Sequence, residues 1–386
     1  MDVLLTAEQE AFRARVRAVV AQHILPRSAE LDESTMVPWD MLHLLVQERI
    51  LGIVIPEEYG GIGEGVDAVP ISIAREELMR GSCTVDSLFA MQGLGSYPII
   101  LGGSEELKRF VLPQIAVGAK LAGYAVTEPN AGSDVAALET QAVRRGDGYV
   151  LNGVKTFISN AGVAAHYVVL AKTDMSKGAK GISAFLVDAE TPGLEATGPF
   201  DLIAPHIVGA LHLRDCYLPA SRRLGAEGDG FRLAMQTFDV YRASVGAAAV
   251  GLAQAAMEET LRYVHERRQF GQALAELQAT QFKVADMATQ IDAARLLVYR
   301  AAKLKDMGAA RVTAEASMAK LFATEMCGRV VDEALQLHGG NGLRRGARIE
   351  RLYRQARAMR IYEGTSEIQR LIIGSSVLRQ AKGVSL

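Results

Sequence analysis

Residues 146–170 have the sequence GDGYVLNGVKTFISNAGVAAHYVVL, and this stretch decides the fold of the middle of the chain. Short runs of β-branched and aromatic residues occur here and further on, at 149–151, 166–170 and 184–187. Glycine-containing turn sequences separate the runs, which is typical of neighbouring strands joined by short connections. No stretch long enough for a crossover helix lies between them, so a dinucleotide-binding βαβ unit is disfavoured. The pattern predicts an antiparallel sheet or barrel from about Lys120 to Gly228.

On the N-terminal side of this region, apolar residues recur every three or four positions, as they do along helices with one buried face. The residues with this spacing are Phe12, Val16, Val19, Val20 and Ile24, followed by Leu42, Leu45, Val46 and Ile50. The pattern predicts a domain of short helices that ends near Val117.

On the C-terminal side, the helical spacing returns after Gly230 in longer segments. One apolar stripe consists of Val284, Met287, Ala288, Ile291, Ala294 and Val298. Residues 309–337 contain no proline and a single glycine, which predicts a helix of roughly six turns or more. Small residues at 246–256 allow helices to approach closely, so we expect a helical bundle.

The order of these regions is helical, then β, then helical, which predicts a multidomain α+β protein. We place an N-terminal helical domain at 1–118, a β domain at 119–228 and a C-terminal helical bundle at 229–386.

The composition argues against several classes of function. The chain of 386 residues has a formal net charge of −2, which provides no attraction for nucleic acid or an anionic membrane surface. Cys83, Cys216 and Cys327 are widely spaced, and neither a CxxC pair nor a His-rich motif accompanies them. We therefore expect no disulfide framework and no metal site.

The sequence also lacks an evident membrane or targeting segment. Its longest uncharged stretch, residues 87–104, contains Pro98 and several glycines, so we expect loops to break it rather than a membrane span to form. Acidic residues occur early, at Asp2, Glu8 and Glu10, which is atypical of a signal or transit peptide. A cytoplasmic protein is expected.

Three glycine-containing segments are candidates for chemistry, although each has an ordinary structural explanation when taken alone. The segment YAVTEPNAGSD at 124–134 has backbone amides and a serine hydroxyl that would suit a phosphate, or it is a simple turn. The glycines after His338 suit a closely approaching ligand or a helix cap. Glu363 precedes a predicted final helix, where a carboxylate also favours the helix dipole.

Motifs for other common enzyme classes do not occur: the chain has no GxSxG elbow, Walker loop, GxGxxG fingerprint or HExxH pair. Six segments together, however, closely resemble the acyl-CoA dehydrogenase family in order and placement, over nearly the whole chain. They are YAVTEPNAGSD from Tyr124, NGVKTFIS from Asn152, ERRQFG from Glu266, LQ from Leu277, QLHGG from Gln336 and IYEGTSEIQR from Ile361. The resemblance implies an N-terminal all-α domain, a middle antiparallel β-barrel and a C-terminal four-helix bundle.

The resemblance also implies FAD as the cofactor and assigns residues to it. In the β domain these are Tyr124, Val126, Thr127, Gly132, Ser133, Phe157, Ile158 and Ser159. Residues implied to reach FAD across a subunit interface are Arg267, Gln278, Gln336, Leu337, Gly339 and Gly340, and Phe270 is also implied to bind the cofactor. Thr365, Ser366 and Glu367 would complete the cofactor site. A homotetramer, formed as a dimer of dimers, is therefore expected.

Glu363 matches the catalytic base of the family, which removes the α-proton of an acyl-CoA while flavin N5 takes the β-hydride. The implied product is a trans-2-enoyl-CoA, and the expected electron acceptor is an electron-transferring flavoprotein. The residues implied to bind the thioester are Ser133, Asp239, Tyr241, Arg242, Tyr362 and Gly364. Some relatives place the base just before the arginine that matches Arg242, but Tyr241 stands there in this chain.

One segment departs from the family pattern. Residues 200–210 lack the usual Gly-x-Arg-x-Ser turn, and His206 lies in this part of the sequence. The departure leaves the acyl group open, including its length, branching and ring content. It also leaves an enzyme for carrier-protein thioesters as an alternative. An acyl-CoA oxidase is a further alternative, which shares the fold and which the sequence does not separate from a dehydrogenase. A non-catalytic helical scaffold is a distant alternative, because it would not need the flavin turn and the acid together.

Overall fold

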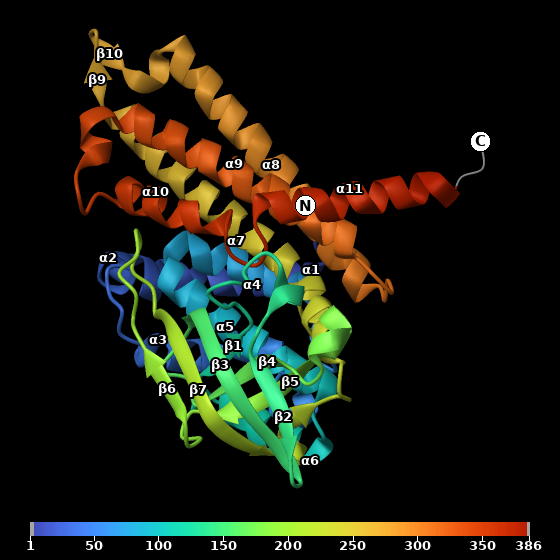
Figure 1. Ribbon diagram of the computed structural model, residues 1–386. Coiled ribbons are helices and arrows are strands. Elements are labelled where there is room, and N and C mark those ends of the chain that lie inside the picture. The colour runs from blue at the N-terminus through green and yellow to red at the C-terminus, as the bar shows by residue number, and fades with distance from the viewer. Residues whose placement is uncertain (1–3, 384–386) are drawn as a thin grey trace. The chain divides into compact units, whose positions relative to one another are not determined.

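The computed structural model describes residues 4–383, and the chain forms two compact units within it (Figure 1). One unit contains the residues up to Glu33, Asp67–Asp86 and the chain from Asp239 onward. The other consists of Ser34–Val66 and Ser87–Phe238. Each unit therefore collects segments that are distant in the sequence.

The second unit is built around a sheet of eight strands. The strands are β1 (Ala122–Ala125), β2 (Gln141–Arg145), β3 (Gly148–Ser159), β4 (His166–Lys172), β5 (Ile182–Asp188), β6 (Leu194–Thr197), β7 (Val208–Pro219) and β8 (Arg223–Leu224). They are ordered β6-β7-β3-β2-β4-β5-β8, and β1 pairs with β4. The prediction of a sheet in this region is confirmed.

The predicted closed, purely antiparallel barrel is wrong in two respects for the described residues. The hydrogen-bonded order runs from β6 to β8 and does not close. In addition, β1 runs parallel to β4, with Ala122 opposite His166, and β2 meets β4 in a single parallel pair. Some strands that follow each other in the sequence are therefore not neighbours in the sheet. For example, β2 lies between β3 and β4.

Helices α3 (Trp39–Gln47), α5 (Cys83–Gly102) and α6 (Glu105–Ala116) lie wholly or largely in this unit. The expectation that loops break residues 87–104 is wrong, because α5 continues through Pro98. Close packing explains why the glycines do not end the helix. A Cβ at Gly95 would lie 2.5 Å from Ala122, and Gln92 accepts a hydrogen bond from the Ala122 amide. Tertiary contacts thus override the weak helix propensity of glycine here.

The first unit consists of helices. They are α1 (Ala7–Val19), α2 (Ser28–Asp32), α4 (Ala68–Gly81), most of α7 (Gly230–Glu266), α8 (Gln278–Asp306), α9 (Thr313–His338), α10 (Arg348–Met359) and α11 (Ser366–Gly383). The two strands β9 (Arg268–Gln269) and β10 (Gln272–Ala273) form a small hairpin between α7 and α8. The core is rich in alanine from α7 and α9, which confirms the close helix packing expected for the small-residue run.

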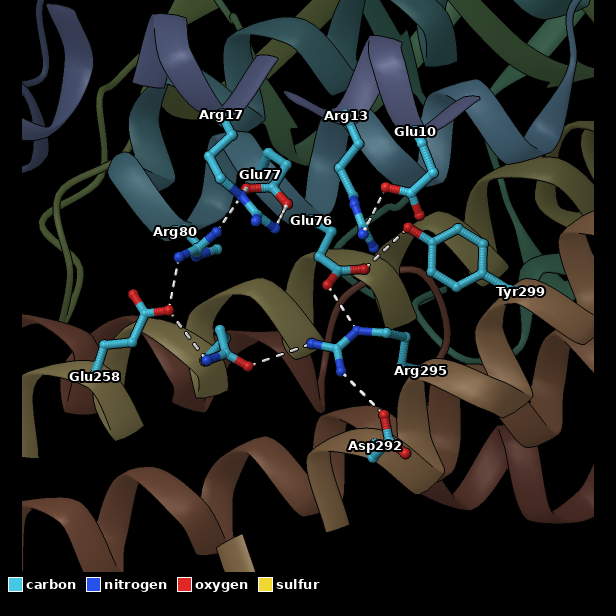
Figure 2. Close-up of polar contacts among 11 residues, drawn as sticks. Glu10, Arg13, Arg17, Glu76, Glu77, Arg80, Glu258, Asp292, Arg295 and Tyr299 are labelled. Carbon is cyan, nitrogen blue, oxygen red and sulfur yellow. Dashed lines mark hydrogen bonds and ion pairs between the residues drawn. The ribbon is translucent and has the colours of Figure 1, made fainter. Parts of the chain in front are cut away.

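Ion pairs around the buried carboxylates of Glu76 and Glu77 connect α4 to α1, α7 and α8 within this unit (Figure 2). Arg17 donates hydrogen bonds of 3.1 and 2.6 Å to the Glu77 carboxylate, whose side chain is only 1% exposed. Arg80 bridges Glu77 to Glu258, and Arg295 donates to Glu76 at 2.9 Å. Because each buried carboxylate has a cationic partner, this network can lie inside the helical unit.

None of the helices within residues 4–383 combines the length with the apolar character that a membrane span requires.

Candidate functional site

The predicted cofactor residues of the β domain lie on β1, on the turn that follows it, and on β3. Tyr124 is buried in β1, and its ring meets Phe238 edge-on at a centroid distance of 6.1 Å. Gly132 and Ser133 lie in the exposed turn. A Cβ at Gly132 would meet no described atom of this chain within 4 Å, so packing within the chain does not explain the glycine.

The end of β3 presents an aromatic side chain to the outside. Its pairing with β7 shifts register between Lys155 and Ile158, and Phe157 lies in this irregularity at φ 54°. Phe157 is 62% exposed and meets Phe200 edge-on at 5.5 Å, while Ile158 points into the core. The bulge therefore turns Phe157 outward from a strand whose neighbouring residues are largely buried.

A buried ion pair joins these two segments. Lys155 in β3 donates to Glu128 at 2.7 Å and to the Val126 carbonyl at 3.1 Å, and both charged side chains are almost inaccessible. The Thr156 amide also donates to the Thr127 carbonyl at 2.9 Å. Burial lowers the pKa of Lys155 to about 8 although Glu128 opposes the shift. The sequence motifs contain both residues, but sequence reasoning assigned neither of them.

The unusual segment before β7 also contacts β3. His206 Nε2 lies 3.0 Å from the Ser159 hydroxyl, and the Asn160 amide donates to the Ile207 carbonyl at 2.8 Å. Burial lowers the pKa of His206 to about 4, so the ring is neutral at ordinary pH. His206 therefore holds a hydroxyl that the resemblance assigns to the flavin edge.

These features fit the flavin that the resemblance implies. Phe157 offers an exposed aromatic face, Gly132 leaves open space in an exposed turn, and Ser159 has a fixed hydroxyl. An aromatic ring, a glycine turn with backbone amides, and a hydroxyl are suitable partners for a ring system that carries phosphates.

The residues predicted to act across a subunit interface gather at one end of the helical bundle. Arg267 lies between α7 and β9, Phe270 lies in the turn between β9 and β10, Gln278 begins α8, and Gln336 and Leu337 lie in the last turn of α9. His338 stacks on Tyr263 of α7 at 4.4 Å, and Asn341 donates to the Tyr263 hydroxyl, which fixes the loop containing Gly339 and Gly340. Phe270 is 93% exposed, and Arg267 and Gln278 are also exposed. The contribution of this set to a cofactor site remains a prediction.

Helix α7 presents the predicted thioester residues. Tyr241 and Arg242 are buried, and Asp239 is half-buried and accepts a hydrogen bond of 2.8 Å from Thr313. Burial raises the pKa of Asp239, whereas Thr313 and Arg242 act against that shift.

Glu363 lies in the turn between α10 and α11, just ahead of the final helix. Its φ is 52°, and the next residue, Gly364, has φ 95°, so two consecutive residues are left-handed. Ser366 begins α11, donates to Glu325 at 2.6 Å and is buried, whereas the side chain of Glu367 is 78% exposed. The turn places Glu363 outside the helix, so it is not simply an acid of the first helical turn.

The Glu363 carboxylate lies among charged groups of the helical unit. The residue as a whole is half-buried, but its Oε2 atom is buried and has no hydrogen-bond partner among the described residues. Burial raises the pKa of Glu363 to about 7, even though the positive charges of Arg75, Lys320 and Arg242 oppose the shift. The carboxyl group is therefore able to accept a proton near neutral pH.

Two buried charges beside Glu363 were not found from the sequence. Arg75 in α4 donates two hydrogen bonds to Asp86, at 3.0 and 2.8 Å, and a third to Ser244 at 3.1 Å. Lys320 in α9 donates to the Gly364 carbonyl at 2.8 Å. Arg75 lies in a run of charged residues and Lys320 in a long helix. Charged residues in such places usually face solvent, so the sequence did not indicate that these two are buried. The break in an otherwise apolar stripe around Lys320 was the available signal.

In the part of the chain that the structure describes, no group of three His, Cys, Asp or Glu side chains is arranged to hold a metal ion.

Models of three protein domains match this chain. They are the N-terminal domain of acyl-CoA dehydrogenase at residues 6–119, the middle domain at 123–216 and the C-terminal domain at 228–378.

Similar proteins agree with these matches. The probable acyl-CoA dehydrogenase YngJ of Bacillus subtilis is 41% identical, with 98% of this chain and 100% of that protein covered. The caffeyl-CoA reductase-Etf complex subunit CarC of Acetobacterium woodii is 40% identical over 91% of this chain and 93% of that protein. A glutaryl-CoA dehydrogenase from Mycobacterium smegmatis, solved in complex with FADH2, has a TM-score of 0.90 and 30% identity, with 97% and 95% of the two chains covered.

Proposed function

Because this chain belongs to the acyl-CoA dehydrogenase family, we propose that it removes the α-proton of an acyl-CoA thioester with Glu363 and forms a trans-2-enoyl-CoA. The protein is an FAD-dependent oxidoreductase. The chemistry supplied by bound FAD is acceptance of the β-hydride of the acyl group. The residues that would hold it are those of the β1 turn and the end of β3, completed by Thr365, Ser366 and Glu367.

The observation that carries the proposal is the state of the Glu363 carboxylate. An exposed carboxylate has a pKa of about 4.3 and is a weak base toward a carbon acid. Here burial raises the pKa to about 7, and Oε2 is buried without a hydrogen-bond partner among the described residues. A group in this state can take a proton from a substrate carbon without first giving up an existing hydrogen bond. Arg242 and Asp239 on α7 would hold the CoA portion of the substrate.

The pH dependence follows from the need for an ionised base. Glu363 accepts a proton only as a carboxylate, so kcat/KM should fall about tenfold for each pH unit below the pKa of about 7. Initial rates with saturating acceptor, measured from about pH 5.5 to 8.5, would show this fall on the acidic side of the pH–rate profile, which is its acid limb. A rate that stays constant across that range, with the protein still folded and yellow, would contradict the assignment.

Reduction of the bound flavin by acyl-CoAs tests the function most directly. The purified protein is titrated anaerobically with straight, branched and cyclic acyl-CoAs while the flavin absorbance is followed. Bleaching by one class supports the proposal and identifies the acyl group. Pivaloyl-CoA is a matched control because it has no α-proton, so it should bind without bleaching. Bound flavin that no CoA thioester reduces would oppose the proposal and favour a carrier-protein substrate.

The electron acceptor is part of the proposal. An electron-transferring flavoprotein is the expected partner, and the similarity to CarC, a subunit of a complex with Etf, supports it. Rapid oxygen consumption during turnover would instead support an acyl-CoA oxidase.

We further propose a homotetramer, for which the exposed hairpin would provide a contact surface, and three domains divided near 118 and 228. Arg267→Ala should lower FAD retention or disrupt assembly, because its guanidinium is expected to reach the cofactor of a neighbouring subunit. Gel filtration and the flavin-to-protein ratio measure both effects. Arg268→Ala removes the adjacent exposed arginine of β9 and is the matched control. Equal flavin content and size in the two variants would argue against the role of Arg267.

A further inference from the structure

The turn that carries Glu363 has a backbone shape that requires external support. Glu363 has φ 52° and Gly364 has φ 95°. A left-handed conformation is unfavourable for a residue with a side chain, because its Cβ approaches the following carbonyl oxygen. A Cβ at Gly364 would also lie only 2.6 Å from Gln369 Nε2, so the second position is restricted to glycine. Contacts from outside the turn must therefore stabilise this conformation.

Two side chains hold the carbonyl groups of the turn. Lys320 Nζ donates to the Gly364 oxygen at 2.8 Å, and Gln369 Nε2 donates to the same oxygen at 2.9 Å. Gln369 Nε2 also donates to the backbone carbonyl oxygen of Glu363 at 3.4 Å. Lys320 and Gln369 are both fully buried. The Gly364 carbonyl thus receives two donors, one from α9 and one from α11.

A second contact fixes the turn on its other side. Glu325, one helical turn and a residue beyond Lys320 on α9, accepts from Ser366 at 2.6 Å and from Arg360 at 3.4 Å. The Ser366 amide donates to the Arg360 carbonyl at 3.1 Å. Helix α9 therefore contacts both ends of the segment 360–366, and Lys320 is the contact beside the base.

A buried ammonium group is an expensive way to hold a carbonyl, because a neutral donor would avoid the desolvation of a full charge. Burial lowers the pKa of Lys320 to about 8, and the negative charge that most strongly opposes this shift is Glu363. Glu325 and Glu367 act in the same direction, and Arg242 acts against them. The principal counter-charge of Lys320 is therefore the carboxylate that it helps to place.

We propose that Lys320 is a positioning residue for the reaction: its ammonium holds the Gly364 carbonyl, and thereby the left-handed turn that aims Glu363, and it is one of the positive charges beside which that carboxylate ionises. The inference rests on the proposed role of Glu363 as the base. It adds a residue that the sequence motif around Glu363 does not include.

Other charged groups also act on Glu363 and must stay constant in a test. They are Arg75 on α4, Asp86 on α5, Arg242 on α7, and Lys320 itself on α9. Substitutions at Lys320 leave the first three in place. A change in the acid limb of the pH profile can then be attributed to the lost ammonium.

Three substitutions separate the two roles of Lys320. Lys320→Met removes both the charge and the donor at similar side-chain length. Lys320→Gln retains a donor without the charge, and Lys320→Arg retains both. Lys320→Met should lower kcat by about 100-fold, as expected for a misplaced catalytic group, with a smaller change in KM. Its acid limb should move up by about one pH unit, because a nearby cation no longer favours the carboxylate.

Lys320→Gln should show the same upward shift of the acid limb with a smaller loss of kcat. Lys320→Arg should return the limb to the wild-type position. Lys283→Met is the matched control, because Lys283 pairs with Glu333 and does not contact the turn. It should leave the pH profile and kcat unchanged. Flavin absorbance and the thermal midpoint of each holoprotein verify folding before the kinetic comparison.

The proposal would be overturned if folded, flavin-loaded Lys320→Met and Lys320→Gln both kept the wild-type kcat and acid limb. An equal loss of kcat in all three variants, without any shift of the limb, would also overturn it, because that pattern indicates general disruption. Failure of the base assignment is distinguishable, since it would appear as activity in Glu363→Gln. If Glu363→Gln is inactive and the Lys320 variants are normal, only the role of Lys320 is wrong.

Discussion

Glu363→Gln is expected to lower kcat by about 10⁴-fold, the upper end of what a positioned base contributes, while the protein keeps its yellow flavin. The amide has nearly the shape of the carboxylate but cannot accept the α-proton. The turn should be preserved, because Lys320 and Gln369 bind backbone carbonyls rather than the Glu363 side chain. Stopped-flow reduction of the flavin by the best acyl-CoA measures the loss at the chemical step.

Two further variants make this result specific. Glu363→Asp retains a carboxylate on a shorter side chain and should recover part of the rate. Glu333→Gln removes a carboxylate of α9 that pairs with Lys283 and should leave the rate within about twofold, since surface pairs contribute little. Flavin reduction by Glu363→Gln at a rate within tenfold of wild type would refute the assignment of the base.

Asp86→Asn is expected to produce the largest loss of stability, about 3–5 kcal/mol, because it leaves a buried guanidinium without its counter-charge. The side chains of Arg75 and Asp86 are 3% and 0% exposed, and two hydrogen bonds join them. Unfolding in urea, followed by circular dichroism on flavin-saturated protein, measures the shift of the midpoint.

The control for this prediction is Asp292→Asn. Asp292 pairs with Arg295 on α8, but its side chain is 69% exposed, so its loss should cost less than about 1 kcal/mol. The double variant Arg75→Met/Asp86→Leu removes the pair as a unit and should recover much of the lost stability. Similar midpoints for Asp86→Asn and Asp292→Asn would show that the buried pair stabilises the fold no more than the exposed pair does.

The sequence was sufficient for features that depend on local pattern. The β-branched runs between glycine turns predicted the sheet, a long apolar stripe predicted α8, and the lack of proline in residues 309–337 predicted α9. Glu363 was placed ahead of α11, where the structure has it. These features arise from periodicity and turn chemistry over short distances, which a single sequence contains.

Features that depend on distant partners were not predictable in the same way. The parallel pairing of β1 with β4 joins segments about forty residues apart, and no local pattern specifies that choice. Pro98 and its neighbouring glycines suggested a broken segment, yet packing against Ala122 maintains α5. Arg75, Lys320 and Lys155 are charged residues whose burial depends on partners elsewhere in the chain, so they resembled residues of solvated surfaces.

The supports of the Glu363 turn all lie between Lys320 and Gln369, whereas the departure from the family pattern lies at 200–210 in the β-sheet unit. The hydrogen bonds that hold the turn come from Lys320, Glu325 and Gln369, which all belong to the helical unit. Substitutions at Lys320, Glu325 or Gln369 would therefore alter how the base is held, and they leave the sequence of the 200–210 segment untouched.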